Sequence, residues 1–186
     1  MEDLSLHILD IAENSVSAGA SVIQIKITED IKENVLLVEI SDNGEGMDEN
    51  AVKAVTDPFF TTKAERGRRV GLGIPLLAQA AREADGDISI VSEKGRGTTI
   101  KARFQHDHID RKPVGDIAMT LTILISANPE IDFVFEYKRN DQSYEVDTRE
   151  IREELEDVPI NDPAVIKFIK DSISKWLSDT KSIMLE

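Results

Sequence analysis

The sequence has 186 residues, 40% of them hydrophobic, and a formal net charge of -14 at pH 7. It contains no cysteine, which excludes disulfides, thiol nucleophiles and cysteine metal sites. The acidic balance argues against nucleic acid as a partner, because phosphate backbones need clustered Lys and Arg. No early segment resembles a signal peptide, and none approaches the ~20 apolar residues of a membrane span, so we expect a globular cytoplasmic protein without membrane contact.

The first half of the chain predicts both helices and strands. Apolar residues at helical spacing indicate a first helix from Leu4 to Val16, which a glycine, Gly19, ends. Two strands, 21–28 and 35–41, are expected to pair as an antiparallel hairpin. Further on we expect a short helix over 49–55 capped by Asp48, a helix over 73–84, and strands over 87–91 and 98–104.

The pattern changes after Phe104. Residues 105–113 are polar and are expected to connect two parts of the chain. The second part predicts a helix over 117–126, strands over 131–137 and 143–147, and helices over 148–156 and 162–178. The sequence leaves open whether this part forms an independent domain or extends the first sheet.

Two features of the last helices are specific enough to test. Asp147 is expected to cap the helix over 148–156, with Glu150 reaching back as in a capping box. The final helix carries an apolar stripe that we expect to pack rather than to bind a ligand, formed by Val165, Phe168, Ile169, Ile173, Trp176 and Leu177.

Polar residues stand at the ends of several predicted elements. Asp10 and Asn14 are four apart and share one helical face, where a carboxylate and an amide oxygen suit a hydrated Mg²⁺ ion; the alternative is a solvated face. Asp42 follows a strand and precedes Gly44 and Gly46. A carboxylate there can accept a hydrogen bond from an exocyclic amine while the glycines admit a flat ring, the alternative being an Asx turn.

The segment between the second and third predicted helices has features of a phosphate site. Glycines that open a helix expose backbone N–H groups to a phosphate, and the helix dipole favours the same anion. Gly71 and Gly73 stand at this place, at the start of the helix over 73–84. Four cations between Lys63 and Arg69 would draw an anionic ligand, with plain surface solvation as an equal alternative.

Taken in order, the segments HILDIAENSVSAGA, DNGEGM, DPFFTTK, GLGIPLLAQAA and GRGTT resemble the GHKL superfamily, the ATP-binding domains of DNA gyrase, heat-shock chaperones, histidine kinases and MutL. The resemblance covers Leu4 to Phe104. It implies an α+β, two-layer α/β sandwich of the Bergerat ATP-binding type, in which helices cover one face of a mixed, largely antiparallel sheet. On this basis we expect an ATP-binding domain over 1–104, a linker over 105–113 and a small α/β extension over 114–186.

The same resemblance implies roles for individual residues. Asn14 would be the Mg²⁺ ligand, and Asp42 would contact the adenine amino group. Thr98 or Thr99 would close the pocket beside Asp42 through water. The remaining nucleotide contacts would come from the adenine pocket, the lid and the phosphate loop, namely Gly44, Gly46, Met47, Phe60, Thr61, Lys63, Gly71, Leu72 and Gly73.

The sequence departs from the family at the catalytic base. Superfamily ATPases carry Glu four residues before the metal-binding Asn, whereas this chain has Asp10, whose shorter side chain reaches less far toward a γ-phosphate. We therefore expect slow hydrolysis, with Asp10 as the base to test. We expect His7 to be solvent-exposed or merely hydrogen-bonded, and not a phosphoacceptor. His106 and His108 could hold a metal, although solvated side chains are the commoner outcome.

Three functions follow from the resemblance. The first is an Mg-ATP-binding protein similar to a histidine kinase catalytic domain, which acts on a separate protein partner by phosphoryl transfer or by its nucleotide state. The second is a MutL-like ATPase switch with slow hydrolysis and ATP-driven formation of a homodimer. The third is a non-catalytic nucleotide sensor. The part after residue 113 is a candidate module for binding a partner or for dimerisation, and packing against the first part is an equal alternative.

Overall fold

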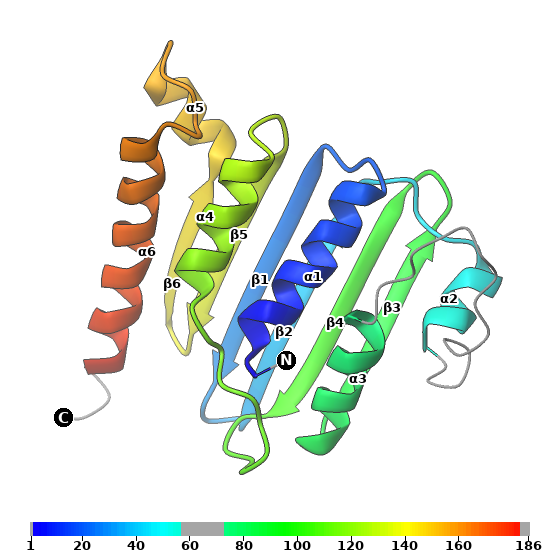
Figure 1. The fold of residues 1–186 in the computed structure, drawn as a ribbon. Coiled ribbons are helices and arrows are strands. Elements are labelled where there is room, and N and C mark those ends of the chain that lie inside the picture. Colours follow the sequence, from blue (N-terminus) through cyan, green and yellow to red (C-terminus); the bar gives the residue numbers. More distant parts are fainter. Residues whose placement is uncertain (1, 57–72, 183–186) are drawn as a thin grey trace.

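The computed structural model describes residues 2–56 and 73–182, with the backbone alone for residues 181 and 182. Figure 1 shows a single sheet with helices on one side of it. In chain order the elements are α1 (Leu4–Ser17), β1 (Val22–Asp30), β2 (Val35–Asp42), α2 (Glu49–Thr56), α3 (Gly73–Glu83), β3 (Asp87–Glu93), β4 (Gly97–Gln105), α4 (Ile117–Ala127), β5 (Asp132–Arg139), β6 (Gln142–Asp147), α5 (Thr148–Leu155) and α6 (Pro163–Ser182).

The sheet has six strands in the order β3-β4-β2-β1-β5-β6. Within it, β1 and β5 pair in parallel, and the other four neighbouring pairs are antiparallel. Helices α1, α3, α4 and α6 lie on the same face of this sheet (Figure 1). The prediction of an α+β fold with a largely antiparallel sheet covered on one face is therefore confirmed.

The predicted elements all occur, with ends that differ by a few residues. Two of the predicted helix caps are also confirmed. Asp48 accepts a hydrogen bond from the backbone N–H of Ala51 at 2.9 Å, and Asp147 accepts one from the backbone N–H of Arg149 at 2.9 Å. Such side chains satisfy backbone donors that a helix leaves unpaired in its first turn.

The part of the chain after residue 113 continues the first sheet. Strand β5 lies beside β1 in parallel register, with Ile23 opposite Phe133. Helix α4 lies next to α1, and the hydroxyl of Thr120 donates to the carbonyl of Ser5 at 3.4 Å. One hydrophobic core spans both parts and includes Leu4 and Phe104 together with Phe133, Phe135 and Ile173. Of the two arrangements that the sequence left open, the structure has the extended sheet.

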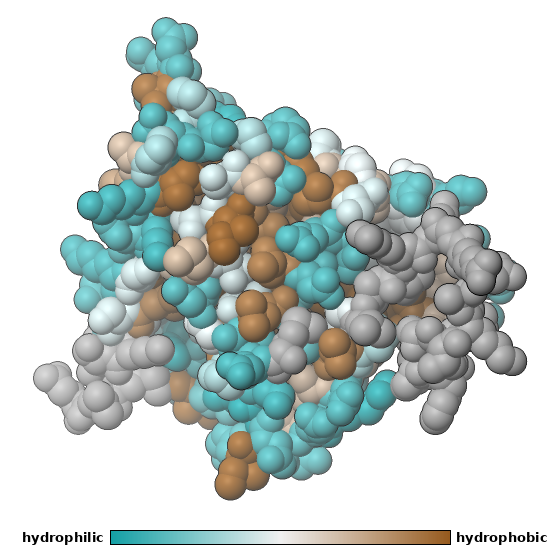
Figure 2. Space-filling model, viewed as in Figure 1, coloured by the Kyte–Doolittle hydropathy of each residue, from teal (hydrophilic) through white to brown (hydrophobic). Residues whose placement is uncertain are grey.

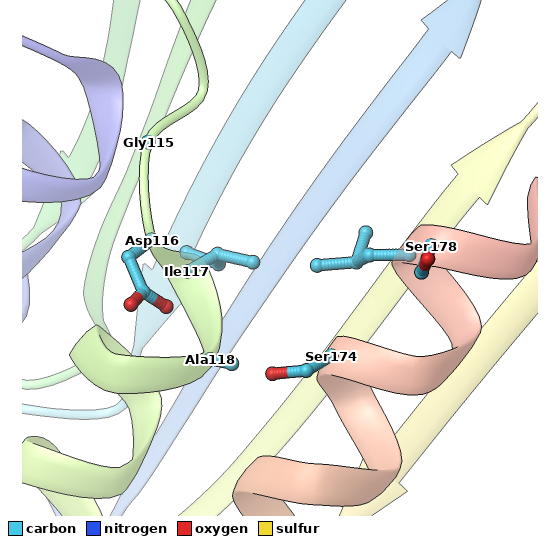
Figure 3. A pocket seen from close by; sticks show the side chains of 7 residues that line it. Gly115, Asp116, Ile117, Ala118, Ser174 and Ser178 are labelled. Atoms are coloured by element: carbon cyan, nitrogen blue, oxygen red, sulfur yellow. The ribbon is translucent and has the colours of Figure 1, made fainter. Parts of the chain in front are cut away.

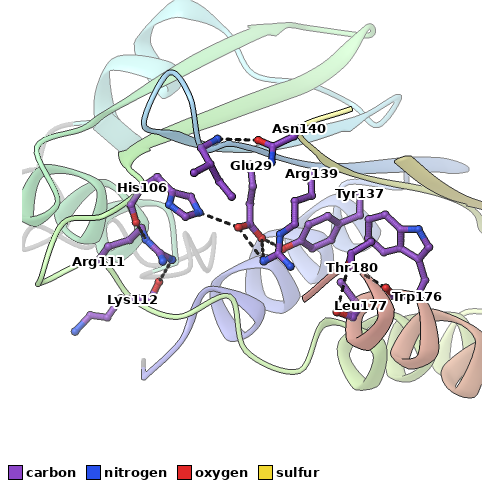
Figure 4. Close-up of polar contacts among 11 residues, drawn as sticks. Glu29, His106, Arg111, Lys112, Tyr137, Arg139, Asn140, Trp176, Leu177 and Thr180 are labelled. Atoms are coloured by element: carbon purple, nitrogen blue, oxygen red, sulfur yellow. Dashed lines mark hydrogen bonds and ion pairs between the residues drawn. The ribbon is translucent and has the colours of Figure 1, made fainter. Parts of the chain in front are cut away.

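A buried ionic cluster joins the two parts at one end of β1 (Figure 4). The carboxylate of Glu29 accepts a hydrogen bond from the hydroxyl of Tyr137. Nη2 of Arg139 donates to both oxygens of the same carboxylate, at 2.9 and 3.0 Å. Nε2 of His106 lies 2.8 Å from the same carboxylate. Burial acts to raise the pKa of Glu29, but the bonds to Tyr137, His106 and Arg139 outweigh it and hold the pKa below its usual value.

The two histidines after β4 do not form a metal site together, contrary to the alternative that the sequence suggested. His106 contacts Glu29, whereas Nε2 of His108 lies 3.4 Å from a carboxylate oxygen of Asp85. Within residues 2–56 and 73–182 no group of three or more His, Cys, Asp or Glu is placed to hold a metal. Nor are the two rings freely solvated, since each is paired with a carboxylate of another element.

The final helix packs largely as predicted, with one exception. Val165, Ile169 and Ile173 are buried, but Phe168 is 70% exposed, so the prediction that it packs was wrong. The reason is the position of α6, which lies at the outer edge of the helix layer and leaves one flank uncovered (Figure 1). None of the helices in the described ranges combines the length and the apolar character of a membrane span.

Candidate functional site

The candidate site begins at Asp42, the last residue of β2. The hydroxyl of Ser15 in α1 donates to Oδ2 of Asp42 at 2.7 Å, and the backbone N–H of Gly44 donates to Oδ1 at 2.9 Å. These two bonds fix the orientation of the carboxylate. Each carboxylate oxygen can accept more than one hydrogen bond, so the group keeps capacity for an external donor.

The loop after Asp42 is held from two sides and needs its glycines. A Cβ on Gly46, where φ is +64°, would lie 2.1 Å from the carbonyl oxygen of Glu93. A Cβ on Gly44 would lie 2.8 Å from the carbonyl oxygen of Ala18. Glu45 in turn donates to the carbonyl of Ala18 at 2.9 Å, so the loop is tied to the end of α1. Only glycine fits at these two positions without displacing backbone.

Strands β3 and β4 bring two more polar side chains to the same place, those of Ser92 and Thr98. Thr98 is the register partner of Asp42, so the two side chains share one face of the sheet, whereas Thr99 pairs with Ser41 and faces the other way. The hydroxyl oxygens of Thr98 and Ser92 are 2.8 Å apart. Ser92 also accepts from the backbone N–H of Met47 at 2.8 Å. The structure thus brings the predicted residues Thr98 and Met47 together beside Asp42.

A second cluster lies where α1 meets the start of α3. A Cβ built on Gly73 would be 1.9 Å from Oδ2 of Asp10, so the carboxylate packs directly against this glycine. Gly73 is the first residue of α3, and a helix N-terminus favours negative charge. Asn14 follows Asp10 by one turn on the same side of α1 and is half-buried. The Asp10 and Asp42 clusters therefore lie along one helix.

The environment of His7 differs from the one that the sequence predicted. It is buried, with 2% of its surface exposed, and its Nδ1 has no hydrogen-bond partner in the described part of the chain. Burial, followed by the positive charge of the N-terminus, lowers its pKa, which favours the neutral ring. The expectation of an exposed or hydrogen-bonded histidine was wrong because α3 and α4 flank α1 and cover positions that the sequence suggested were open.

Several predicted site residues lie outside the described residues, namely Phe60, Thr61, Lys63, Gly71 and Leu72, together with the cation cluster around Lys63. Conversely, the sequence reasoning missed Ser15 and Ser92. A signal for Ser15 was present, since it follows Ile11 by four residues and so falls on the buried face of α1. A hydroxyl on that face needs a partner, and Asp42 provides it.

A separate depression of about 420 Å³ lies between the start of α4 and α6, away from these clusters (Figure 3). Its wall includes Asp116, Ile117, Ser174 and Leu177. Asp116 is already engaged as the cap of α4, where it accepts from the backbone N–H of Met119 at 2.9 Å. The other polar side chains that line the depression are those of Ser174 and Ser178.

The fold is that of an α+β domain with one cluster of polar groups around Asp42, and comparison with known proteins identifies its family. Residues 2–108 match the family of histidine kinase-, DNA gyrase B- and HSP90-like ATPases. The match covers more than half of the chain, and the protein belongs to this family. ATP binding is the activity that membership implies.

One curated relative is described as a putative sensor protein and another as a signal transduction kinase. A putative sensor protein of Shewanella frigidimarina is 32% identical over 104 residues, which are 56% of this chain and 15% of that protein. The signal transduction histidine-protein kinase AtoS of Escherichia coli is 37% identical over 99 residues, 53% of this chain and 16% of that protein. The chain thus corresponds to a small part of the length of either relative.

Among solved structures, the N-terminal domain of a DNA repair protein has a TM-score of 0.51 to this chain at 16% identity. The similarity covers 79% of this chain and 52% of that one, so it extends beyond the region of the family match. At this level of identity it shows a shared fold.

Proposed function

We propose that this protein binds Mg-ATP between α1, the loop after β2 and the start of α3, and transfers the γ-phosphate to a separate protein. The observation that carries the proposal is the carboxylate of Asp42, held by Ser15 and Gly44 at a strand end where glycines permit close approach. An oriented carboxylate accepts a hydrogen bond from the adenine amino group, and the neighbouring glycines leave room for the flat base.

The neighbouring side of α1 suits the phosphates, since Asn14 directly precedes Ser15 and Asp10 lies one turn earlier. Asn14 and Asp10 offer oxygen ligands on one side of the helix, as a hydrated Mg²⁺ requires, and bound Mg²⁺ would neutralise phosphate charge. Helix α3 begins at Gly73, beside Asp10, so the first backbone N–H groups of α3 are candidates for phosphate contacts. Lys63, Gly71 and Leu72 remain candidates for the same role. Phosphoryl transfer depends mainly on such positioning of the reactants and on neutralisation of the phosphate charge.

The positions of the three histidines favour a phosphoacceptor on another molecule. All three are described: His7 is buried, and His106 and His108 are paired with Glu29 and Asp85. Glu29 is near the end of β1, whereas Asp42 pairs with Ile23 near its start, so His106 is remote from the site. The two relatives, a putative sensor protein and a signal transduction histidine-protein kinase, make a signalling role the natural context.

A second candidate function is a nucleotide-dependent switch, and the contact between Asp10 and Gly73 favours it. A base must come within hydrogen-bond reach of the water or hydroxyl that it activates. Aspartate is short, and its carboxylate packs against α3. If this contact persists with ATP bound, hydrolysis is slow and the nucleotide state itself becomes the signal.

Phosphate release from Mg-ATP, measured at several protein concentrations, separates these two functions from that of a dimerising ATPase. Asp10→Asn and Asn14→Ala serve as controls for the base and the metal ligand. Tight binding without turnover is the result expected for a kinase whose acceptor is another protein or for a switch. Specific activity that rises with protein concentration and is lost in both variants would indicate a dimerising ATPase instead. Failure to bind Mg-ATP would refute the proposal.

A further inference from the structure

The outer surface of the helix layer carries an exposed apolar strip. Met119 and Ile123 are four residues apart on α4 and are 41% and 45% exposed, and Leu6 on the adjacent α1 is 41% exposed. Helix α4 has no charged residue in its sequence, IAMTLTILISA. Figure 2 shows hydrophobic side chains gathered along the middle of this surface, over α4 and α1. The solvent face of a surface helix is ordinarily polar, so this strip is unusual for a face that stays in water.

The two helices that border α4 differ in charge. Helix α1 contains Asp10 and Glu13 and no Lys or Arg. Helix α6 contains more Lys than Asp, although the whole chain has a net charge of -14. Lys167 is exposed, and Nζ of Lys170 lies 3.9 Å from the sulfur of Met119, at the border of the strip. Asp10 packs on the far flank of α1, so across the surface the order is Glu13 of acidic α1, apolar α4, and the lysines of basic α6.

We propose that this surface is the interface with a second copy of the same chain, related by a two-fold axis parallel to α4. Rotation about that axis places α4 against α4 of the partner and the acidic α1 of each copy opposite the basic α6 of the other. A two-fold interface is built from one self-complementary patch, and this order of charges has that property. An axis across the helices would instead pair acid with acid and base with base.

The direction of the helices is consistent with this pairing. In Figure 1 the last turn of α1 and the first turns of α6 lie at the same end of the helix layer. Glu13 is in the last turns of α1 and Lys167 is in the first turns of α6. Rotation about an axis along α4 keeps each residue at its own end, so Glu13 faces the region of Lys167 of the second copy. Asp10 packs on the other flank of α1, against Gly73.

The molar mass in solution, measured by sedimentation over a range of concentrations, tests the interface. We expect a reversible dimer, and we expect Ile123→Lys to raise its dissociation constant about tenfold or more. Phe168→Lys is the matched control, because Phe168 is an apolar side chain that is even more exposed, at 70%, but is not part of the strip. A monomeric wild type, or a dimer that Ile123→Lys leaves unchanged, would overturn the proposal.

Charge reversal tests the orientation of the axis. Glu13→Lys and Lys167→Glu should each weaken self-association, because each introduces two like-charged contacts into its dimer. An equimolar mixture of the two variants should form a heterodimer of wild-type strength, since both contacts are then oppositely charged. If the mixture associates no better than the single variants, this axis is wrong. Unfolding curves of each variant verify that the fold is intact.

Discussion

Ser15 and Asp42 are 27 residues apart in sequence, yet the hydroxyl of Ser15 donates to Oδ2 of Asp42 at 2.7 Å. The bond links the buried face of α1 to the end of β2 and holds the carboxylate in one orientation. We expect Ser15→Ala to weaken Mg-ATP binding by about 1 kcal/mol, or roughly fivefold in Kd, because Asp42 loses one of the two bonds that orient its carboxylate. Titration calorimetry measures the change. Ser17→Ala, on the exposed side of the same helix, should leave Kd unchanged.

Two glycines near the site, Gly46 in the loop after β2 and Gly95 in the turn between β3 and β4, differ in their tolerance of a side chain. Gly46 and Gly95 both have positive φ, but a Cβ on Gly46 would strike the backbone of Glu93, whereas a Cβ on Gly95 meets nothing within 4 Å. We expect Gly95→Ala to lower the free energy of unfolding by about 1 kcal/mol, the cost of the backbone conformation alone. Gly46→Ala should cost at least twice as much. Equal losses in urea unfolding would contradict the close approach at Gly46.

The buried cluster around Glu29 should contribute to stability. Glu29→Gln removes the negative charge that faces Arg139, whose side chain is only 12% exposed. Leaving one member of a buried ion pair unpaired costs about 3 kcal/mol or more. The control is Glu136→Gln on the uncovered face of the sheet, where Glu136 pairs with Lys26 at 2.7 Å and stays partly exposed. That change should cost less than about 1 kcal/mol, so similar losses for the two variants would refute the role of the cluster.

Protonation of His7 should make stability depend on pH. Burial lowers the pKa of His7 in the folded protein below the value of 6.5 expected in the unfolded chain. The unfolded chain therefore binds more protons near and below that pH, and stability is complete above the unfolded pKa and falls as the pH is lowered through it. We expect His7→Gln to flatten this slope from about pH 7 downward, because the two states bind different numbers of protons only near and below the reference pKa. The slope should persist in His108→Asn.

Local chemistry in the sequence was sufficient to predict the order of the elements and the strand end that carries Asp42. Hydrophobic periodicity specifies helices and strands, and the helix caps at Asp48 and Asp147 were readable from single residues. The burial of His7 and the exposure of Phe168 depend on which helices lie side by side, which periodicity does not contain. Likewise, Glu29 looked like a polar residue near a hairpin, and only the parallel pairing of β5 with β1 brings Tyr137 and Arg139 to it.

The most direct test of the account is the equilibrium binding of Mg-ATP to Asp42→Asn. The substitution keeps the size of the side chain but replaces one acceptor oxygen with a donor that opposes the adenine amino group. Asp48→Asn is the matched control, because asparagine also caps helices well. We predict a loss of affinity of at least about tenfold for Asp42→Asn, none for Asp48→Asn, and a folded protein in both cases. Unchanged affinity of a folded Asp42→Asn variant would contradict the assignment of Asp42 as the adenine contact.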